Sequence, residues 1–163
     1  MISVDAKYLV RLGTVFIVII SQIYFPIIHV GAIQIQPDIV LLYITVLAIL
    51  YGRLLSIIMG FFLGLIQDFS TQVELLGILS LSKSIAAYII GSIYNYKTIW
   101  SQKTQYIVLL GAYFIHFFIY FYLFSRSIFD WYYLFIFILI HSVIVFLFFI
   151  LFNNLIYKNK LLQ

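Results

Sequence analysis

The sequence predicts an all-α integral membrane protein, a six-helix transmembrane bundle with both termini in the cytoplasm and one domain over residues 1–163. Its composition is 66% hydrophobic and 9% charged, with a mean hydropathy of +1.19. A soluble domain is about 25% charged, because its surface faces water. Several uncharged runs also reach about 20 residues, the length with which a helix crosses roughly 30 Å of hydrocarbon. These runs lack the alternation of a membrane barrel, so we interpret them as helices.

The same composition excludes several other classes of protein. No cysteine is present, which excludes a secreted disulfide scaffold. The nine Lys and Arg against five Asp and Glu are a bias that membrane topology explains by itself, so no nucleic-acid partner is expected.

The first span is expected over residues 12–33, with Pro26 tolerated as a kink near its far end. Val30, Gly31 and Ala32 also resemble a signal-peptide cleavage site behind a basic amino end, which is the alternative for this segment. The hydrophobic run is longer than a usual signal core, so we expect it to remain in the protein.

The second and third spans are expected over residues 38–52 and 54–68, as a hairpin that turns at Gly52. Arg53 is the one charge between Ile39 and Gln67. A single long helix would strand it near the bilayer centre at a cost of about 2.5–3.5 kcal/mol, whereas a turn places it at a surface. Both spans are at the lower limit of length, so we expect them inside the bundle.

The remaining spans are expected over residues 75–96, 104–125 and 131–157. Six spans obey the positive-inside rule, because seven basic residues then face the cytoplasm and only Arg126 lies outside; one long helix instead of the hairpin would divide the loop bases three against four. The inner group is Lys7, Arg11, Arg53, Lys97, Lys103, Lys158 and Lys160, and the acids outside are Asp38, Asp68, Glu74 and Asp130.

Small residues mark one face of the third span. Ser56, Gly60, Gly64 and Asp68 recur every four residues and therefore share a helix face. Such a face lets another helix approach closely, either within this chain, against the second or fourth span, or from a partner protein. The fourth span carries small residues too, together with Lys83, which we expect to snorkel outward or to pair with Asp68 or Glu74.

No recognised catalytic, cofactor or metal motif is found, so no enzyme activity is expected. Ser80 and Lys83 match an S-x-x-K string, but its companion motifs are missing and we interpret the match as accidental. His116 and His141 could meet across two spans and His29 lies near the outer end of the first. Three protein ligands are needed for a catalytic zinc, so we expect these histidines to bond backbone carbonyls instead.

The order of residues from Pro37 to Gly77 resembles the MreD family of bacterial rod shape-determining membrane proteins. A Pro stands at the mouth of the second span, Gly52 bounds a short hairpin, the string from Gly60 to Asp68 reads G-F-x-x-G-L-x-x-D, and Leu-Gly opens the fourth span. The matching positions are Pro37, Gly52, Gly60, Gly64, Asp68 and Gly77, and the rest of the chain matches by hydropathy alone.

The resemblance implies a non-enzymatic scaffold of the cell-elongation and peptidoglycan-synthesis machinery in the bacterial inner membrane. It implies direct association with MreC, and with MreB, RodA and a penicillin-binding transpeptidase through the complex. It also implies a fold similar to the S components of energy-coupling-factor transporters. We expect the Gly60, Gly64 and Asp68 face, with Lys83 beside it, to serve assembly. The rival hypothesis is a small-molecule transporter subunit whose pocket is lined by His29, His116, His141 and aromatic residues.

Overall fold

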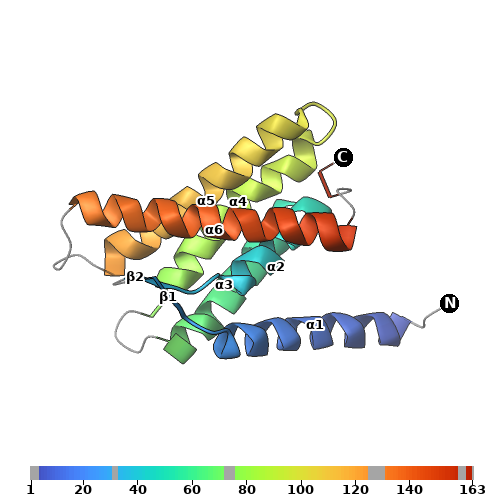
Figure 1. Ribbon diagram of the computed structural model, residues 1–163. Coiled ribbons are helices and arrows are strands. Elements are labelled where there is room, and N and C mark those ends of the chain that lie inside the picture. The colour runs from blue at the N-terminus through green and yellow to red at the C-terminus, as the bar shows by residue number, and fades with distance from the viewer. Residues whose placement is uncertain (1–3, 31–32, 72–75, 125–130, 158–160, 163) are drawn as a thin grey trace.

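The computed structural model describes residues 4–30, 33–71, 76–124, 131–157 and 161–162. Within these ranges the chain forms six helices and one short hairpin of two strands (Figure 1). In chain order they are α1 Val4–Tyr24, β1 Ile28–Val30, β2 Ile33–Ile35, α2 Ile39–Tyr51, α3 Arg53–Thr71, α4 Ile78–Tyr96, α5 Gln102–Phe124 and α6 Trp131–Tyr157.

The first helix is shorter at its far end than the sequence predicted, and the fold is not purely α-helical. Helix α1 ends at Tyr24, and the segment predicted to continue it forms an antiparallel hairpin in which Ile28 pairs with Ile35. Pro26 is the physical reason, since it has no N–H to donate and its ring collides with the preceding turn of a helix. It also disfavours helical dihedrals at the residue before it. Pro26 therefore ends the helix instead of kinking it.

The break between the second and third helices lies where the charge of Arg53 predicted it. Helix α2 ends at Tyr51, and Gly52 has φ 80°, a conformation that residues with a side chain rarely adopt. A Cβ on Gly52 would also lie 3.0 Å from Cδ1 of Tyr94. Helix α3 then begins at Arg53 and runs back along α2.

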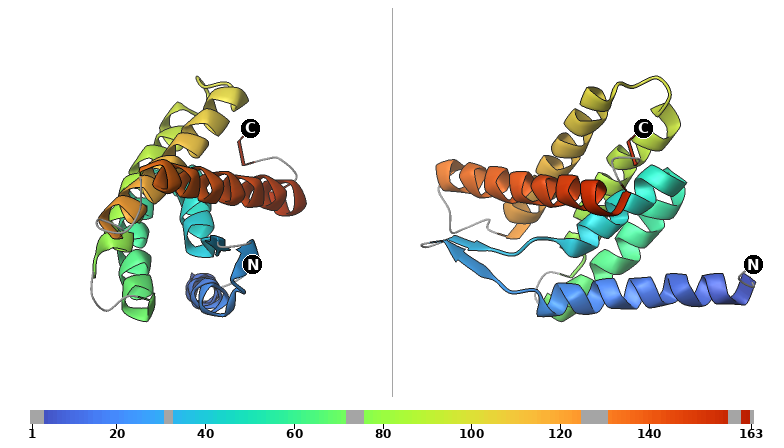
Figure 2. Two further views of the ribbon diagram at one scale, coloured as in Figure 1. Left: turned by 60° about the vertical axis from the view of Figure 1, so that its left-hand side comes forward. Right: turned by 45° about the vertical axis from the view of Figure 1, so that its right-hand side comes forward.

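Helix α4 is the central element of the bundle. It packs against α2, α3 and α5, while α6 crosses α5 and α2, and α1 lies along the outside against α2 and α3 (Figures 1 and 2). Eleven of the 19 residues of α4 are buried, against five of the 19 in α3. The expectation that the two short spans lie inside is therefore right for α2 and wrong for α3, because α3 buries only a narrow stripe of small residues.

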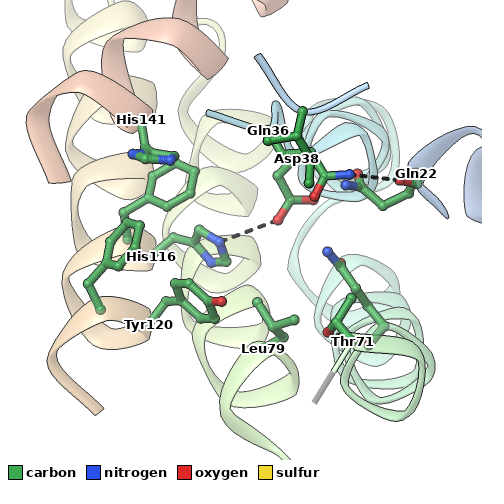
Figure 3. A pocket seen from close by; sticks show the side chains of 12 residues that line it. Gln22, Gln36, Asp38, Thr71, Leu79, His116, Tyr120 and His141 are labelled. Atoms are coloured by element: carbon green, nitrogen blue, oxygen red, sulfur yellow. Dashed lines mark hydrogen bonds and ion pairs between the residues drawn. The ribbon is translucent and has the colours of Figure 1, made fainter. Parts of the chain in front are cut away.

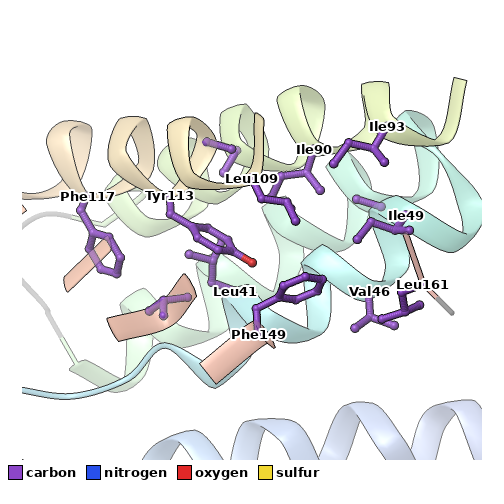
Figure 4. Close-up of a cluster of buried hydrophobic side chains, with 14 of the residues drawn as sticks. Leu41, Val46, Ile49, Ile90, Ile93, Leu109, Tyr113, Phe117, Phe149 and Leu161 are labelled. Carbon is purple, nitrogen blue, oxygen red and sulfur yellow. The ribbon is translucent and has the colours of Figure 1, made fainter. Parts of the chain in front are cut away.

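The hydrophobic core lies between α2, α4, α5 and α6 (Figure 4). Its largest buried side chains include Tyr113, Phe149, Leu41, Ile90 and Leu109. The Tyr113 hydroxyl lies 3.0 Å from the hydroxyl of Thr45, so this polar group has a partner inside the apolar core.

The outside of the helices is more apolar than the surface of a soluble domain, and several ionisable groups are buried. Large apolar side chains cover the outside of the helices, for example Phe16, Phe62 and Leu147. Charged and polar side chains such as Asp38, Lys83 and His116 are buried instead. Helices α3, α5 and α6 are each long and apolar enough to cross a membrane. An apolar exterior, with ionisable groups held inside the bundle, suits lipid as the solvent, so this is a helical membrane protein.

Candidate functional site

Lys83 and Asp38 form an ion pair inside the bundle. The Lys83 ammonium in α4 donates to Oδ2 of Asp38, the residue directly before α2, and neither residue is more than 5% exposed. A charge at this depth is costly unless it is neutralised. Lys83 therefore joins the start of α2 to the central helix.

Asp38 has two further roles around the same carboxylate. Its Oδ1 accepts a 2.9 Å hydrogen bond from the backbone N–H of Leu41, which caps the N-terminus of α2. Its Oδ2 also lies 3.5 Å from Nε2 of His116 in α5. One carboxylate thus connects α2, α4 and α5 at the same end of the bundle.

The prediction that Lys83 pairs with Asp68 or Glu74 is corrected by this geometry. Both carboxylate oxygens of Asp68 are instead occupied by backbone N–H groups at the start of α4: Oδ1 accepts from Leu79 and Oδ2 accepts from Gly77 and Ser80, each at 3.1 Å. Glu74 lies outside the described residues.

Asp68 acts as a helix cap supplied from a different helix. The N-cap residue of α4, Gly77, has φ 99° and no side chain to satisfy the first N–H groups of the helix. The fully buried carboxylate at the end of α3 takes that place, and its negative charge faces the positive end of the α4 dipole. Asp68 therefore holds the end of α3 against the start of α4.

The small-residue face of α3 packs inside the chain. A Cβ on Gly64 would lie 2.5 Å from Cα of Ser80, and a Cβ on Gly60 would lie 3.1 Å from the carbonyl oxygen of Lys83. The backbone of α4 covers this face of α3, so a helix from another protein has no room to pack there. The prediction that the Gly60, Gly64 and Asp68 face binds a partner protein is therefore wrong. The alternative, packing against the fourth span of the same chain, is correct.

Gln22 near the end of α1 makes the corresponding junction with α2. Its Oε1 accepts from the backbone N–H of Ile39 at 2.6 Å, and its Nε2 donates to the carbonyl of Pro37 at 3.5 Å. The side-chain amide of Gln36 in turn donates to the carbonyls of Gln22 and Phe25, both at 3.2 Å. Pro37 therefore lies in a junction that positions Asp38.

A cleft of about 260 Å³ opens beside the ion pair, with walls of different chemistry (Figure 3). Amide and hydroxyl side chains from α1, the linker before α2, and α3 form one wall, and aromatic side chains from α5 and α6 form the other. The polar wall is Gln22, Gln36, Gln67 and Thr71, and the aromatic wall is Phe117, Tyr120, Phe121 and His141. Asp38 and His116 lie between the two walls.

Two of the three histidines that the transporter hypothesis places in a pocket line this cleft. His116 and His141 both line it, and Phe117 and Phe121 pack between their helices with ring centroids 5.5 Å and 5.0 Å from His141. Nδ1 of His141 lies 2.8 Å from the carbonyl of Phe137, the kind of backbone bond that was expected. His29 lies in β1, and its side chain is outside the described part of the structure.

The side chains of the S-x-x-K string point to separate partners. The hydroxyl of Ser80 donates to the carbonyl of Phe61 at 2.9 Å, while Lys83 is held by Asp38. Lys83 is therefore not placed as the base of a serine nucleophile. Across the residues with described side chains, no three His, Cys, Asp or Glu come together as a metal site.

Sequence reasoning missed Asp38 as the partner of Lys83, and it missed Gln22. The available signal for Asp38 was its place after a proline and before an apolar run, which is typical of a helix N-cap. The predicted layout also puts Asp38 and Lys83 toward the same membrane surface. For Gln22 no signal exists in the local sequence, because its bonds join residues about 17 positions apart.

The fold and the site define a helical membrane protein with an ion pair and a polar cleft inside its bundle. No protein-family model, curated protein or solved structure matches the chain. The resemblance to the MreD family accordingly stays a prediction.

Proposed function

We propose that the protein is a non-enzymatic scaffold in the cell-elongation machinery of a bacterial inner membrane, with MreC as its direct partner. The observation that carries the proposal is that the residues behind the MreD resemblance are architectural. Gly52 turns the α2–α3 hairpin, Gly60 and Gly64 allow α3 to pack closely on α4, and Asp68 bonds the backbone of Gly77 at the start of α4. A set of this kind preserves a shape, which is what a scaffold requires.

The proposed layout has six membrane spans with both termini in the cytoplasm. Three connections support this layout, because at each of them the chain leaves one helix and begins the next within a few residues or through a direct hydrogen bond. Gln22 bonds the start of α2, Gly52 separates α2 from α3, and Asp68 caps α4. In this layout Asp38 and the polar cleft lie toward the outer side, and Arg53 lies toward the cytoplasm.

The partner helix needs a surface other than the small-residue face of α3. An apolar groove of about 370 Å³ runs between α1, α2, α3 and α6, and it is lined by Leu47, Met59 and three tyrosines, Tyr43, Tyr51 and Tyr157. A transmembrane helix can pack into such a groove, and its side-chain and backbone groups can also bond tyrosine hydroxyls. We assign this groove to the single membrane helix of MreC.

Filling the groove tests this assignment. We expect Leu47→Trp to lower copurification of MreC several-fold, while Leu110→Trp, at an exposed position of α5 outside the groove, leaves it unchanged. Depletion of the protein should also round the cells. Equal copurification of MreC with both variants would exclude the groove as its binding site. Normal rod-shaped cells after depletion would exclude the scaffold role.

A second candidate function is the substrate-binding membrane subunit of a small-molecule transporter. The specific observation in its favour is the cleft, which joins His116 and His141 with aromatic rings and several amides. Concave sites of mixed apolar and polar lining are typical of small-molecule binding. Tight binding of a vitamin by the purified protein, together with a neighbouring gene for a transport ATPase, would favour this function over the scaffold.

A further inference from the structure

We propose that the guanidinium of Arg53 binds the phosphate of a phospholipid at the surface between α3 and α4. The inference goes beyond both candidate functions, and it requires only that the bundle lies in lipid. Three observations lead to it: a positive charge without a described counter-charge, guanidinium nitrogens that a ligand can reach, and an exposed apolar strip beside them.

Arg53 carries a positive charge that no described carboxylate neutralises. The carboxylates whose side chains the structure describes belong to Asp38 and Asp68, which bond Lys83 and the start of α4. Both lie at the other end of the α2–α3 hairpin from Arg53. A cation that faces lipid without a counter-charge is costly. An anion bound from outside the chain would remove this cost.

The charge lies along the side of the bundle and not at its tip. A Cβ on Gly91 would lie 2.7 Å from Cα of Arg53, so Arg53 is level with Gly91 of α4. Helix α4 continues past this level to Tyr96, about 7 Å further at 1.5 Å per residue (Figure 2). The Arg53 side chain turns away from that end, because its guanidinium carbon lies 4.7 Å from the ring centroid of Tyr88. The guanidinium is therefore held where lipid surrounds the helices.

The terminal nitrogens of the guanidinium are the groups that a ligand can reach. Arg53 is only partly buried. Its Nε is the one nitrogen that is both covered and unbonded, and the two terminal nitrogens make no hydrogen bond within the described residues, so they remain accessible. Their N–H groups form a planar fork that matches two oxygens of a phosphate.

The surface next to the guanidinium suits the rest of a phospholipid. Tyr88 is 53% exposed, and Leu81, two helical turns earlier on the same face of α4, is 50% exposed. The strip from Tyr88 to Leu81 runs away from the Tyr96 end of α4, in the direction an acyl chain takes below its headgroup. A tyrosine at this level is also typical of the membrane interface. A soluble anion gains nothing from an apolar strip, so the phosphate of a lipid fits better.

The test is native mass spectrometry of the full-length protein in a non-ionic detergent, titrated with dioleoylphosphatidylglycerol. We expect saturable binding that Arg53→Gln weakens about threefold to tenfold, the value of a partly exposed charge-assisted bond. Arg53→Lys should weaken it less, because lysine keeps the charge and loses only the fork. The matched control is Lys103→Gln, which removes an exposed cation near the start of α5 and should leave the affinity unchanged.

Two competitors identify which part of the lipid is bound. Dioleoylglycerol has the acyl chains without the phosphate, and glycerol 1-phosphate has the phosphate without the chains. We expect neither to displace the phospholipid at equal concentration. Displacement by either one, absence of saturable binding, or equal loss in Arg53→Gln and Lys103→Gln would overturn the inference. The competition uses the unaltered protein, so it decides the question even if Arg53→Gln does not fold.

Discussion

At the residue scale, Asp38 brings three partners from three helices to one buried carboxylate. It caps α2, neutralises Lys83 and lies against His116. These contacts act on one buried carboxylate, and removing Lys83 leaves its charge uncompensated, because a backbone N–H and a neutral imidazole carry no opposite charge. Stability should therefore depend on the pair as a unit.

We expect Lys83→Met to destabilise the protein by about 3–5 kcal/mol, the usual cost of leaving one half of a buried pair uncompensated. The measurement is thermal unfolding in detergent. The double variant Asp38→Asn with Lys83→Met should recover much of the loss, because Asn still caps α2 and no charge remains. Lys103→Met, at an exposed position of α5, is the control. A Lys83→Met protein as stable as this control would show that the pair has no structural role.

Asp68 should behave as a cap and not as an ion-pair partner. We expect Asp68→Ala to cost about 2 kcal/mol, because three N–H groups at the start of α4 lose their acceptor. Hydrogen exchange at Leu79 and Ser80 should become faster, while exchange in the middle of α5 stays unchanged. Unchanged protection at those two amides would contradict the capping role.

At the element scale, the contact between α3 and α4 is set by the absence of side chains. Gly64 and Gly60 approach the backbone of α4, and Gly91 of α4 approaches Arg53 at the start of α3. The close contacts therefore run from the start of α3, at Arg53, to its middle, at Gly60 and Gly64. In lipid, where apolar surface gains little by association, such close packing supplies much of the attraction between helices.

Alanine substitution distinguishes glycines that pack from glycines that do not. We expect Gly64→Ala to destabilise the protein by about 1–3 kcal/mol, because its Cβ would meet backbone that no rotamer change can move. Gly111→Ala in α5 has nothing within 4 Å and should be neutral or gain up to about 1 kcal/mol from helix propensity. Thermal unfolding of the two variants is the measurement, and equal shifts would disprove the tight contact.

At the scale of the whole molecule, the outside of the helices is largely apolar, and the inside holds Asp38, Asp68 and Lys83. This arrangement makes the orientation in the membrane measurable from single positions. The chain contains no cysteine, so an introduced thiol is the only one that reacts. Ser70 near the end of α3 and Ser101 before α5 are both exposed and lie at opposite ends of α4.

We expect Ser70→Cys to react with a membrane-impermeant maleimide in intact cells, and Ser101→Cys to react only after lysis. The reason is that one crossing, α4, separates the two positions in the six-span layout. Labelling of both from the same side would exclude that layout.

Much of the helical framework could be predicted from local features of the sequence. Hydropathy located the apolar segments, and the cost of burying Arg53 located the turn at Gly52, because both effects depend on residues close together in the chain. The same reasoning failed at Pro26, where two outcomes, a kink or an end, are both compatible with a proline in an apolar run. It identified the packing face of α3 through Ser56, Gly60, Gly64 and Asp68, but it wrongly placed this helix inside the bundle.

By itself, the sequence determined that this protein is built from apolar helices, that a hairpin returns at Gly52, and that Lys83 has either to snorkel outward or to pair. Only the tertiary structure decided that the partner is Asp38, that the glycines of α3 serve α4, and that His116 and His141 share a cleft. The physical reason is that periodicity and hydropathy are properties of short segments. The choice among several acids near one membrane surface depends instead on the distances between helices, which packing alone sets.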